Sequence, residues 1–233
     1  MQENLLETLV IEPADTAQAT VIWLHGLGAD GNDFKSIVPE LDLPQRAAIR
    51  FVFPHAPYRP VTVNRGMTMR AWYDLVGLSA GSPQDASGIQ DSERRLGELI
   101  KAENRRGIPC ERIVLAGFSQ GGAVALYTGL RYPQRLAGIM GLSTYLPLHK
   151  TLEEADKQPN AKVSVFMTHG NQDRVLPFEL GVYSWHWLED HGYSVEWHEY
   201  AMGHQVCMEE IRAIAEWLQQ VLSMVWPHSS GSR

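Results

Sequence analysis

The sequence predicts an α/β fold in which helices cover both faces of a mostly parallel central sheet. Two observations lead to this prediction. Short, almost continuous apolar runs recur along the chain, and such runs are typical of strands that are buried on both faces. Segments with helical periodicity separate most of these runs, and regular alternation of strands with helices favours parallel pairing.

The individual elements follow from these patterns. The predicted strands cover residues 20–24, 49–53, 112–116, 137–142, 163–167 and 194–198. The predicted helices cover residues 87–103, 121–131, 178–190 and 208–225. In the first of these helices, Leu96, Leu99 and Ile100 share one face and charged residues lie opposite. Residues 56–86 are the least regular, and we interpret them as an edge strand followed by a long loop.

Length and composition indicate one globular domain. The chain has 233 residues, of which 44% are hydrophobic and 20% charged. We predict a single domain over residues 1–226 and a flexible Ser/Gly-rich tail over residues 227–233. The net charge of −7 argues against general binding to nucleic acid or to anionic membranes. No apolar stretch is long enough to predict stable insertion into a membrane.

The cysteine content and the first residues predict a cytoplasmic location. The only cysteines, Cys110 and Cys207, are too few for a disulfide scaffold, so we expect two reduced, buried thiols. Residues 1–14 carry three glutamates and no basic cluster, which is unlike a signal peptide. No spacing of ligand residues indicates a metal site, and no cofactor is expected.

The sharpest local motif is Gly-Phe-Ser-Gln-Gly over residues 117–121. A G-x-S-x-G pattern is common by chance, but here it follows a predicted strand and precedes a predicted helix. This setting is the one that a nucleophile elbow requires, with the serine exposed on a tight turn. The alternative is a glycine-rich turn that carries a solvated serine. The context favours Ser119 as a catalytic nucleophile and the α/β-hydrolase fold.

A serine nucleophile needs a base and an acid, which follow it in the order acid, then histidine, in this fold. Asp173 lies in the loop after the strand over 163–167, where an orienting acid belongs, although aspartate also occurs there as a turn residue. Among nine histidines, His204 combines the correct order with a loop after a late strand and a following helix. We therefore predict Ser119, His204 and Asp173 as a triad.

An oxyanion hole needs two backbone donors near the serine. One is expected from the residue after the nucleophile, Gln120, and the other from Leu27 in the glycine-rich loop over residues 24–31. This loop also matches the dinucleotide pattern G-x-G-x-x-G. The dinucleotide interpretation is disfavoured because residues 53–57, which end the next strand, carry no acidic residue.

Together these motifs resemble the carboxylesterase and acyl-protein thioesterase family, also called the phospholipase/carboxylesterase family. The matching segments are residues 24–31, 53–57, 71–74, 117–122, 142–147, 169–173 and 203–204. The resemblance implies hydrolysis of carboxylic esters and of protein thioesters, and it makes a homodimer plausible. The segment around Tyr145 looks more like bacterial carboxylesterases, because relatives that act on acylated proteins often have tryptophan there.

The substrate prediction combines the motifs with this resemblance. We expect Trp72, Leu75, Tyr145 and Leu176, with Leu27, to form an acyl pocket, although Leu75 and Leu176 fit a plain core equally well. The main hypothesis is a serine carboxylesterase that hydrolyses short to medium acyl esters through an acyl-enzyme. The alternatives are an acyl-protein thioesterase or lysophospholipase for long acyl chains, and a non-catalytic relative that binds a small ligand. The expected partner is thus a small-molecule ester or acyl thioester.

Overall fold

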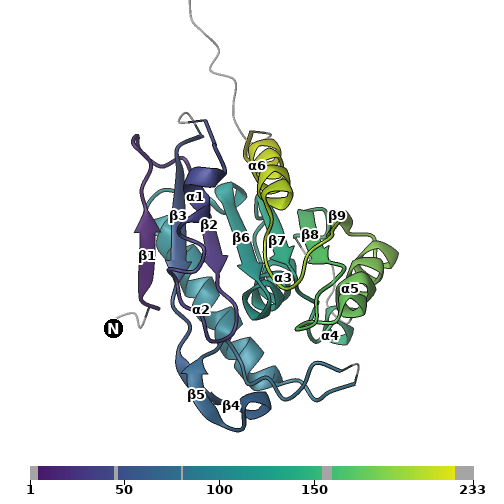
Figure 1. Cartoon of the computed structure of the whole chain (residues 1–233). Coiled ribbons are helices and arrows are strands. Elements are labelled where there is room, and N and C mark those ends of the chain that lie inside the picture. The colour runs from purple at the N-terminus through teal and green to yellow at the C-terminus, as the bar shows by residue number, and fades with distance from the viewer. Residues whose placement is uncertain (1–4, 45–46, 80, 154–158, 224–233) are drawn as a thin grey trace, which may run out of the picture.

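A seven-stranded sheet forms the centre of the protein, with strand order β1-β3-β2-β6-β7-β8-β9 (Figure 1). The computed structural model describes residues 5–44, 47–79, 81–153 and 159–223. In this part of the chain, β1 pairs antiparallel with β3, and every other pair of neighbours in the sheet is parallel. The predicted α/β fold with a mostly parallel sheet is confirmed.

All six predicted strands and all four predicted helices are present. The main sheet contains β1 (Thr8–Ile11), β2 (Ala19–Leu24), β3 (Ile49–Pro54), β6 (Ile113–Phe118), β7 (Gly138–Leu142), β8 (Ser164–Gly170) and β9 (Ser194–Tyr200). A separate hairpin contains β4 (Tyr58–Val61) and β5 (Met67–Arg70). The helices are α1 (Ile37–Glu40), α2 (Ala86–Arg105), α3 (Gln120–Arg131), α4 (Lys150–Glu153), α5 (Phe178–Asp190) and α6 (Met208–Ser223). Short 3₁₀ helices cover Thr62–Asn64 and Cys110–Arg112.

Helices cover both faces of the sheet because the strands are apolar at consecutive positions. Side chains alternate between the faces, so Ile22 and Leu24 pack in one cluster with α2, α3 and α5. Val21 and Trp23 pack in a second cluster with α1 and α6, which lie in front of the sheet in Figure 1. This double burial explains why these strands read as unbroken apolar runs.

Residues 56–86 differ from the prediction. The expected edge strand is wrong, because β4 and β5 pair with each other in a small sheet of their own. Pro60 lies in β4 and has no N–H to offer a larger sheet, which is consistent with this separate hairpin. The edge of the main sheet is instead β1, a half-buried strand of four residues that is too short to show a clear pattern.

Two smaller expectations concern the cysteines and the tail. Both cysteines are free thiols, and Cys110 is buried as expected. Cys207 is only partly buried, so that expectation is wrong for it, because it lies in the surface loop that leads into α6. The predicted tail over residues 227–233 lies outside the described residues.

One buried carboxylate anchors α6 to the sheet. Glu210, in the first turn of α6, is fully buried, and its Oε1 accepts a hydrogen bond from the hydroxyl of Thr168 in β8. Its Oε2 is buried and has no hydrogen-bond partner among the described residues. Burial raises the pKa of this carboxyl group from 4.5 to about 7, because the charged form loses its solvation.

Glu210→Gln is expected to change how stability depends on pH. A carboxyl whose pKa is raised in the folded state stabilises the fold when protonated, and this contribution is lost as pH rises from 4.5 through about 7. The wild type should therefore lose about 2 kcal/mol of unfolding free energy between about pH 5 and pH 8.5 that the variant retains. Urea unfolding at both pH values measures this difference.

The matched control is Glu209→Gln, which changes the exposed neighbour in the same helical turn. Its pH dependence should follow that of the wild type. If the free energy of unfolding of Glu210→Gln changed with pH in the same way as that of the wild type, this would contradict the raised pKa of the buried Glu210 carboxyl.

Candidate active site

Ser119 lies on a tight turn between β6 and α3. Its backbone has φ 53° and ψ −121°, a combination that residues other than glycine seldom adopt. A Cβ at Gly117 would lie 2.3 Å from the backbone of Gly121, and one at Gly121 would lie 2.5 Å from the carbonyl of His25. Both flanking positions of the motif must therefore be glycine, and the turn presents the serine above the carboxyl edge of the sheet.

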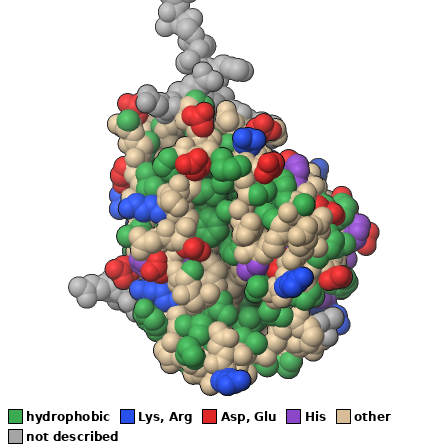
Figure 2. All heavy atoms as spheres, in the orientation of Figure 1, with side chains coloured by type: hydrophobic (Ala, Val, Ile, Leu, Met, Phe, Trp, Pro, Cys, Tyr) green, Lys and Arg blue, Asp and Glu red, His purple; other side chains and the backbone are tan. Residues whose placement is uncertain are grey.

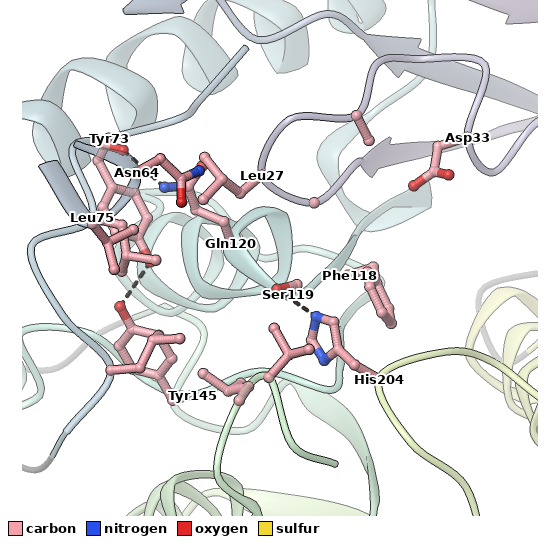
Figure 3. A pocket seen from close by; sticks show the side chains of 16 residues that line it. Leu27, Asp33, Asn64, Tyr73, Leu75, Phe118, Ser119, Gln120, Tyr145 and His204 are labelled. Carbon is pink, nitrogen blue, oxygen red and sulfur yellow. Dashed lines mark hydrogen bonds between the residues drawn. The ribbon is translucent and has the colours of Figure 1, made fainter. Parts of the chain in front are cut away.

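A chain of hydrogen bonds joins Ser119 to two residues from distant loops. The hydroxyl of Ser119 donates to Nε2 of His204 over 2.9 Å, and Nδ1 of His204 donates to Oδ2 of Asp173 over 2.6 Å. Asp173 follows β8 and His204 follows β9, so parallel strands bring all three side chains to the same edge. The imidazole also packs on the ring of Phe118, with centroids 4.7 Å apart. Figure 3 shows the contact between Ser119 and His204 at the centre of the pocket.

Asp173 is held from its other side by the backbone. Its Oδ1 accepts hydrogen bonds from the N–H groups of Val175 and Leu176, over 2.8 and 2.9 Å. The side chain itself is fully buried. One oxygen therefore fixes the carboxylate to its own loop, and the other remains for His204.

A second histidine, which the sequence analysis did not single out, supports this loop. His169 is buried, and its Nε2 lies 3.1 Å from the carbonyl of Leu176 and 3.4 Å from Oδ2 of Asp173. Burial lowers its pKa, so the ring is neutral and donates from Nε2. The motif His-Gly over residues 169–170 was the available signal, because it directly precedes the loop of Asp173.

Two backbone donors line the same pocket as Ser119. Leu27 and Gln120 both line the pocket, and the N–H of Leu27 donates to no other group among the described residues. Gln120 is the first residue of α3, so its N–H has no acceptor within the helix. The neighbouring N–H of Gly28 is satisfied by the carbonyl of Arg70, over 2.9 Å. These two unpaired donors can therefore serve a ligand.

Side chains hold both donor segments in place. The amide of Gln120 accepts from the N–H of Trp72 and donates to the carbonyl of Tyr73, each over 2.8 Å. His25 donates from Nδ1 to the carbonyl of Gly26 over 2.7 Å and accepts from the N–H of Ala56 over 3.0 Å. Burial lowers the pKa of His25 to about 4, so it keeps this neutral tautomer. Neither supporting role was predicted from the sequence.

An apolar pocket of about 390 Å³ opens beside Ser119. Four of the residues named in the sequence analysis for an acyl pocket line it: Leu27, Leu75, Tyr145 and Leu176. Further lining residues that the prediction missed include Val63, Asn64, Tyr73, Leu78 and Val175. Its volume lies within the range of small-molecule sites.

Trp72 was expected in this pocket, but it does not line it. Its side chain is 1% exposed, and its indole N–H donates to the carbonyl of His25 over 2.8 Å. The next residue, Tyr73, takes the place expected for Trp72. Its hydroxyl forms a hydrogen bond of 2.8 Å with that of Tyr145, on the side of the pocket away from His204 (Figure 3).

The described residues contain no group of three or more His, Cys, Asp or Glu side chains that could hold a metal ion.

Comparison with known proteins gives the family. Residues 6–222 match the profile of the phospholipase/carboxylesterase family. The chain belongs to this family. It is therefore a carboxylic ester hydrolase with the α/β-hydrolase fold, as the resemblance implied.

Individual members of the phospholipase/carboxylesterase family are similar along most of their length. Acyl-protein thioesterase 1 from Neurospora crassa is 40% identical over 216 residues, which cover 89% of this chain and 88% of the relative. The protein of the same name from Yarrowia lipolytica is 40% identical over 214 residues, with 89% and 94% covered.

Solved structures of similar proteins agree with this fold. Acyl-protein thioesterase 2 from Zea mays is 32% identical with a TM-score of 0.84, and 93% of this chain and 99% of that chain are covered. SOBER1 from Arabidopsis thaliana is 31% identical with a TM-score of 0.84, and the corresponding shares are 88% and 100%.

Proposed function

We propose that this enzyme hydrolyses long-chain acyl thioesters on proteins, with Ser119, His204 and Asp173 as its catalytic triad. The observation that carries this proposal is the hydrogen-bonded chain of these residues at an apolar pocket. The names of the fungal relatives favour a protein thioester over the short to medium acyl ester of the main sequence hypothesis. A lysophospholipid is the second candidate, because the family description includes phospholipases.

The first half-reaction forms an acyl-enzyme. His204 Nε2 takes the proton of Ser119 while Oγ attacks the thioester carbonyl carbon, and Asp173 stabilises the resulting imidazolium. The N–H groups of Leu27 and Gln120 bind the negative oxygen of the tetrahedral intermediate. This intermediate then breaks its C–S bond, and His204 returns the proton to the leaving sulfur, which departs as a thiol.

The second half-reaction releases the acyl group. Water enters where the thiol has left, His204 takes one of its protons, and the hydroxide oxygen attacks the acyl carbon. The same two backbone donors bind the second oxyanion. Collapse of this intermediate frees the carboxylic acid, and Ser119 recovers its proton from His204.

An acyl-length series tests the substrate class. One peptide cysteine is acylated with butyryl, octanoyl or palmitoyl, and hydrolysis is followed by release of the thiol. We expect the palmitoyl peptide to be cleaved at least as efficiently as the butyryl peptide, because each buried methylene contributes about 0.8 kcal/mol of binding. Cleavage of short aryl esters but of no peptide thioester would contradict the proposal. Faster cleavage of a palmitoyl lysophospholipid than of the palmitoyl peptide would favour the second candidate.

Leu75→Trp is expected to shorten the acyl chain that the enzyme accepts. Leu75 lines the pocket, and a larger side chain there removes space that the distal methylenes would fill. We expect kcat/KM for the palmitoyl peptide to fall by at least about tenfold relative to that for the butyryl peptide. Val76→Trp is the matched control, because it adds the same indole at an exposed neighbour outside the pocket. Equal losses for both acyl chains in Leu75→Trp would contradict the assignment of this pocket.

No helix among the described residues is long and apolar enough to span a membrane. The cytoplasmic location stays a prediction from the sequence, and the homodimer stays a prediction from the resemblance. Analytical ultracentrifugation of the purified chain measures its oligomeric state.

A further inference from the structure

A second cavity adjoins the acyl pocket at His204. Its volume is about 530 Å³. Its lining residues, which we call the α1–α6 groove, are Asp33, Phe34, Ser36, Ile37, Glu40, Phe118, His204, Gln205, Val206 and Ile211. Asp33, Phe118 and His204 also line the acyl pocket, so the two cavities meet at the reacting histidine.

The reaction geometry divides the substrate between these two cavities. The carbonyl must lie between Ser119 and the free N–H groups of Leu27 and Gln120, which line only the acyl pocket. The leaving atom must receive a proton from His204 Nε2, and this histidine borders both cavities. Figure 3 shows Asp33 on the opposite side of Ser119 from Leu75 and Tyr145. With the acyl chain in its pocket, the leaving group therefore extends into the α1–α6 groove.

The groove combines an apolar floor with negative charge. Phe34, Ile37 and Ile211 are buried, whereas the carboxylates of Asp33 and Glu40 are exposed. None of the lining residues is lysine or arginine, and among the described residues neither carboxylate forms an ion pair or a hydrogen bond. In Figure 2, red carboxylates, together with a blue basic side chain, border green apolar surface in the region of α1 and α6. A cation placed here would meet two unpaired acidic groups.

The environment of Asp33 favours such a cation. Partial desolvation and the nearby charge of Asp30 raise the pKa of Asp33. A positive group beside Asp33 would offset both effects, because it stabilises the charged form of the carboxylate. The net charge of −7 on the chain acts in the same direction by attracting cationic substrates.

We propose that the α1–α6 groove binds the peptide segment that carries the acylated cysteine, and that Asp33 and Glu40 select segments with lysine or arginine beside that cysteine. The inference rests on the proposed thioesterase function and names its substrate class more closely. The apolar floor holds the peptide backbone and the aliphatic stems of the basic side chains, while the carboxylates meet their charged ends. A basic acylated peptide is thus expected to be a better substrate than a neutral one of the same shape.

The test compares two octanoyl-cysteine peptides that differ only in the acetylation of the lysines on either side of the cysteine. Acetylation removes the charge and keeps the side-chain stem. For the wild type we expect kcat/KM to be about fivefold higher for the lysine peptide, as two partly exposed ion pairs permit. Asp33→Asn and Glu40→Gln should each reduce this ratio, and the double variant should bring it close to unity. Glu189→Gln, at an exposed site on α5 outside both cavities, should leave the ratio unchanged.

A second pair of substrates separates this inference from the proposed function. Octanoyl thiocholine carries a cationic leaving group. The octanoyl thioester of 3,3-dimethylbutane-1-thiol is its neutral isostere. A preference for the cation in both pairs, lost in the double variant, would support the groove. Equal rates within both pairs would overturn the groove while leaving the thioesterase function intact. Inert peptides together with a cation preference among the small thioesters would overturn the protein substrate and retain the charge selection.

Salt provides an independent readout of the same charges. Raising the ionic strength from about 0.05 M to about 0.5 M shortens the screening length severalfold and should bring the wild-type ratio toward that of the double variant. A ratio that does not respond to salt would show that the preference arises from shape and would overturn the electrostatic selection.

Discussion

Ser119→Ala is expected to lower kcat by roughly five to six orders of magnitude, which is the effect of removing the nucleophile from a serine triad. Without Oγ no acyl-enzyme can form, and only the oxyanion donors and the binding pocket still act on the substrate. Alanine keeps the same Cβ and the same unusual φ of 53°, so the turn and the fold should persist. Turnover of the octanoyl peptide and circular dichroism measure the two parts of this expectation.

A labelling experiment supplies the control for this variant. A fluorophosphonate should modify the wild type at Ser119, as mapped by mass spectrometry, and should leave Ser119→Ala unlabelled. Ser143→Ala is the matched control, because Ser143 also has a positive φ but is fully buried, and its Oγ has no partner among the described residues. It should keep both labelling and turnover. Normal turnover by Ser119→Ala would refute the proposed mechanism.

Asp173→Asn is expected to lower kcat by about 10⁴-fold, the loss that follows when a triad histidine takes the wrong tautomer. The surrounding contacts determine how the new amide is oriented. The N–H groups of Val175 and Leu176 donate to Oδ1 over 2.8 and 2.9 Å, so the amide oxygen must face them. Its NH₂ group then faces Nδ1 of His204, where Oδ2 now accepts over 2.6 Å. His204 would respond by carrying its proton on Nε2, where it can no longer accept the proton of Ser119.

The pH dependence and a distant variant complete this prediction. The remaining activity of Asp173→Asn should rise at alkaline pH, where hydroxide can replace the missing base. Asp190→Asn, at the exposed end of α5, makes the same chemical change far from the site and should keep full turnover. A loss of less than about tenfold in Asp173→Asn would mean that the tautomer of His204 is set by another group.

The strongly buried parts of the fold were predictable because their pattern is unambiguous. Strand β2 is apolar at every position except Thr20 and is fully buried, so its sequence indicates both the strand and its central place. Strand β1 is half-buried and has only four residues, and the hairpin of β4 and β5 lies apart from the main sheet. Such elements depend on their neighbours more than on their own pattern. The sequence analysis therefore missed β1 and assigned residues 56–86 an edge strand instead of a separate hairpin.

The proposed catalytic side chains could also be predicted from the sequence, because each follows a strand and their order along the chain is characteristic of the fold. Motif and order pointed to Ser119, Asp173 and His204, and the structure brings these three side chains into contact. The residues that line the two cavities could be predicted from the sequence only in part. Trp72 and Tyr73 are neighbours with similar chemistry, yet Trp72 packs in the core and Tyr73 lines the pocket.

Local pattern was thus sufficient for the buried strands and helices, the tight turn at Ser119 and the order of the reactive residues, because each depends on a short stretch of chain. The tertiary structure decided which neighbour faces a cavity and which loops meet. Adjacent side chains in an extended segment point in opposite directions, and only packing against distant segments selects between them. For the same reason Asp33 and His204, which are far apart in the chain, could be recognised as walls of one groove only after folding placed α1 beside α6.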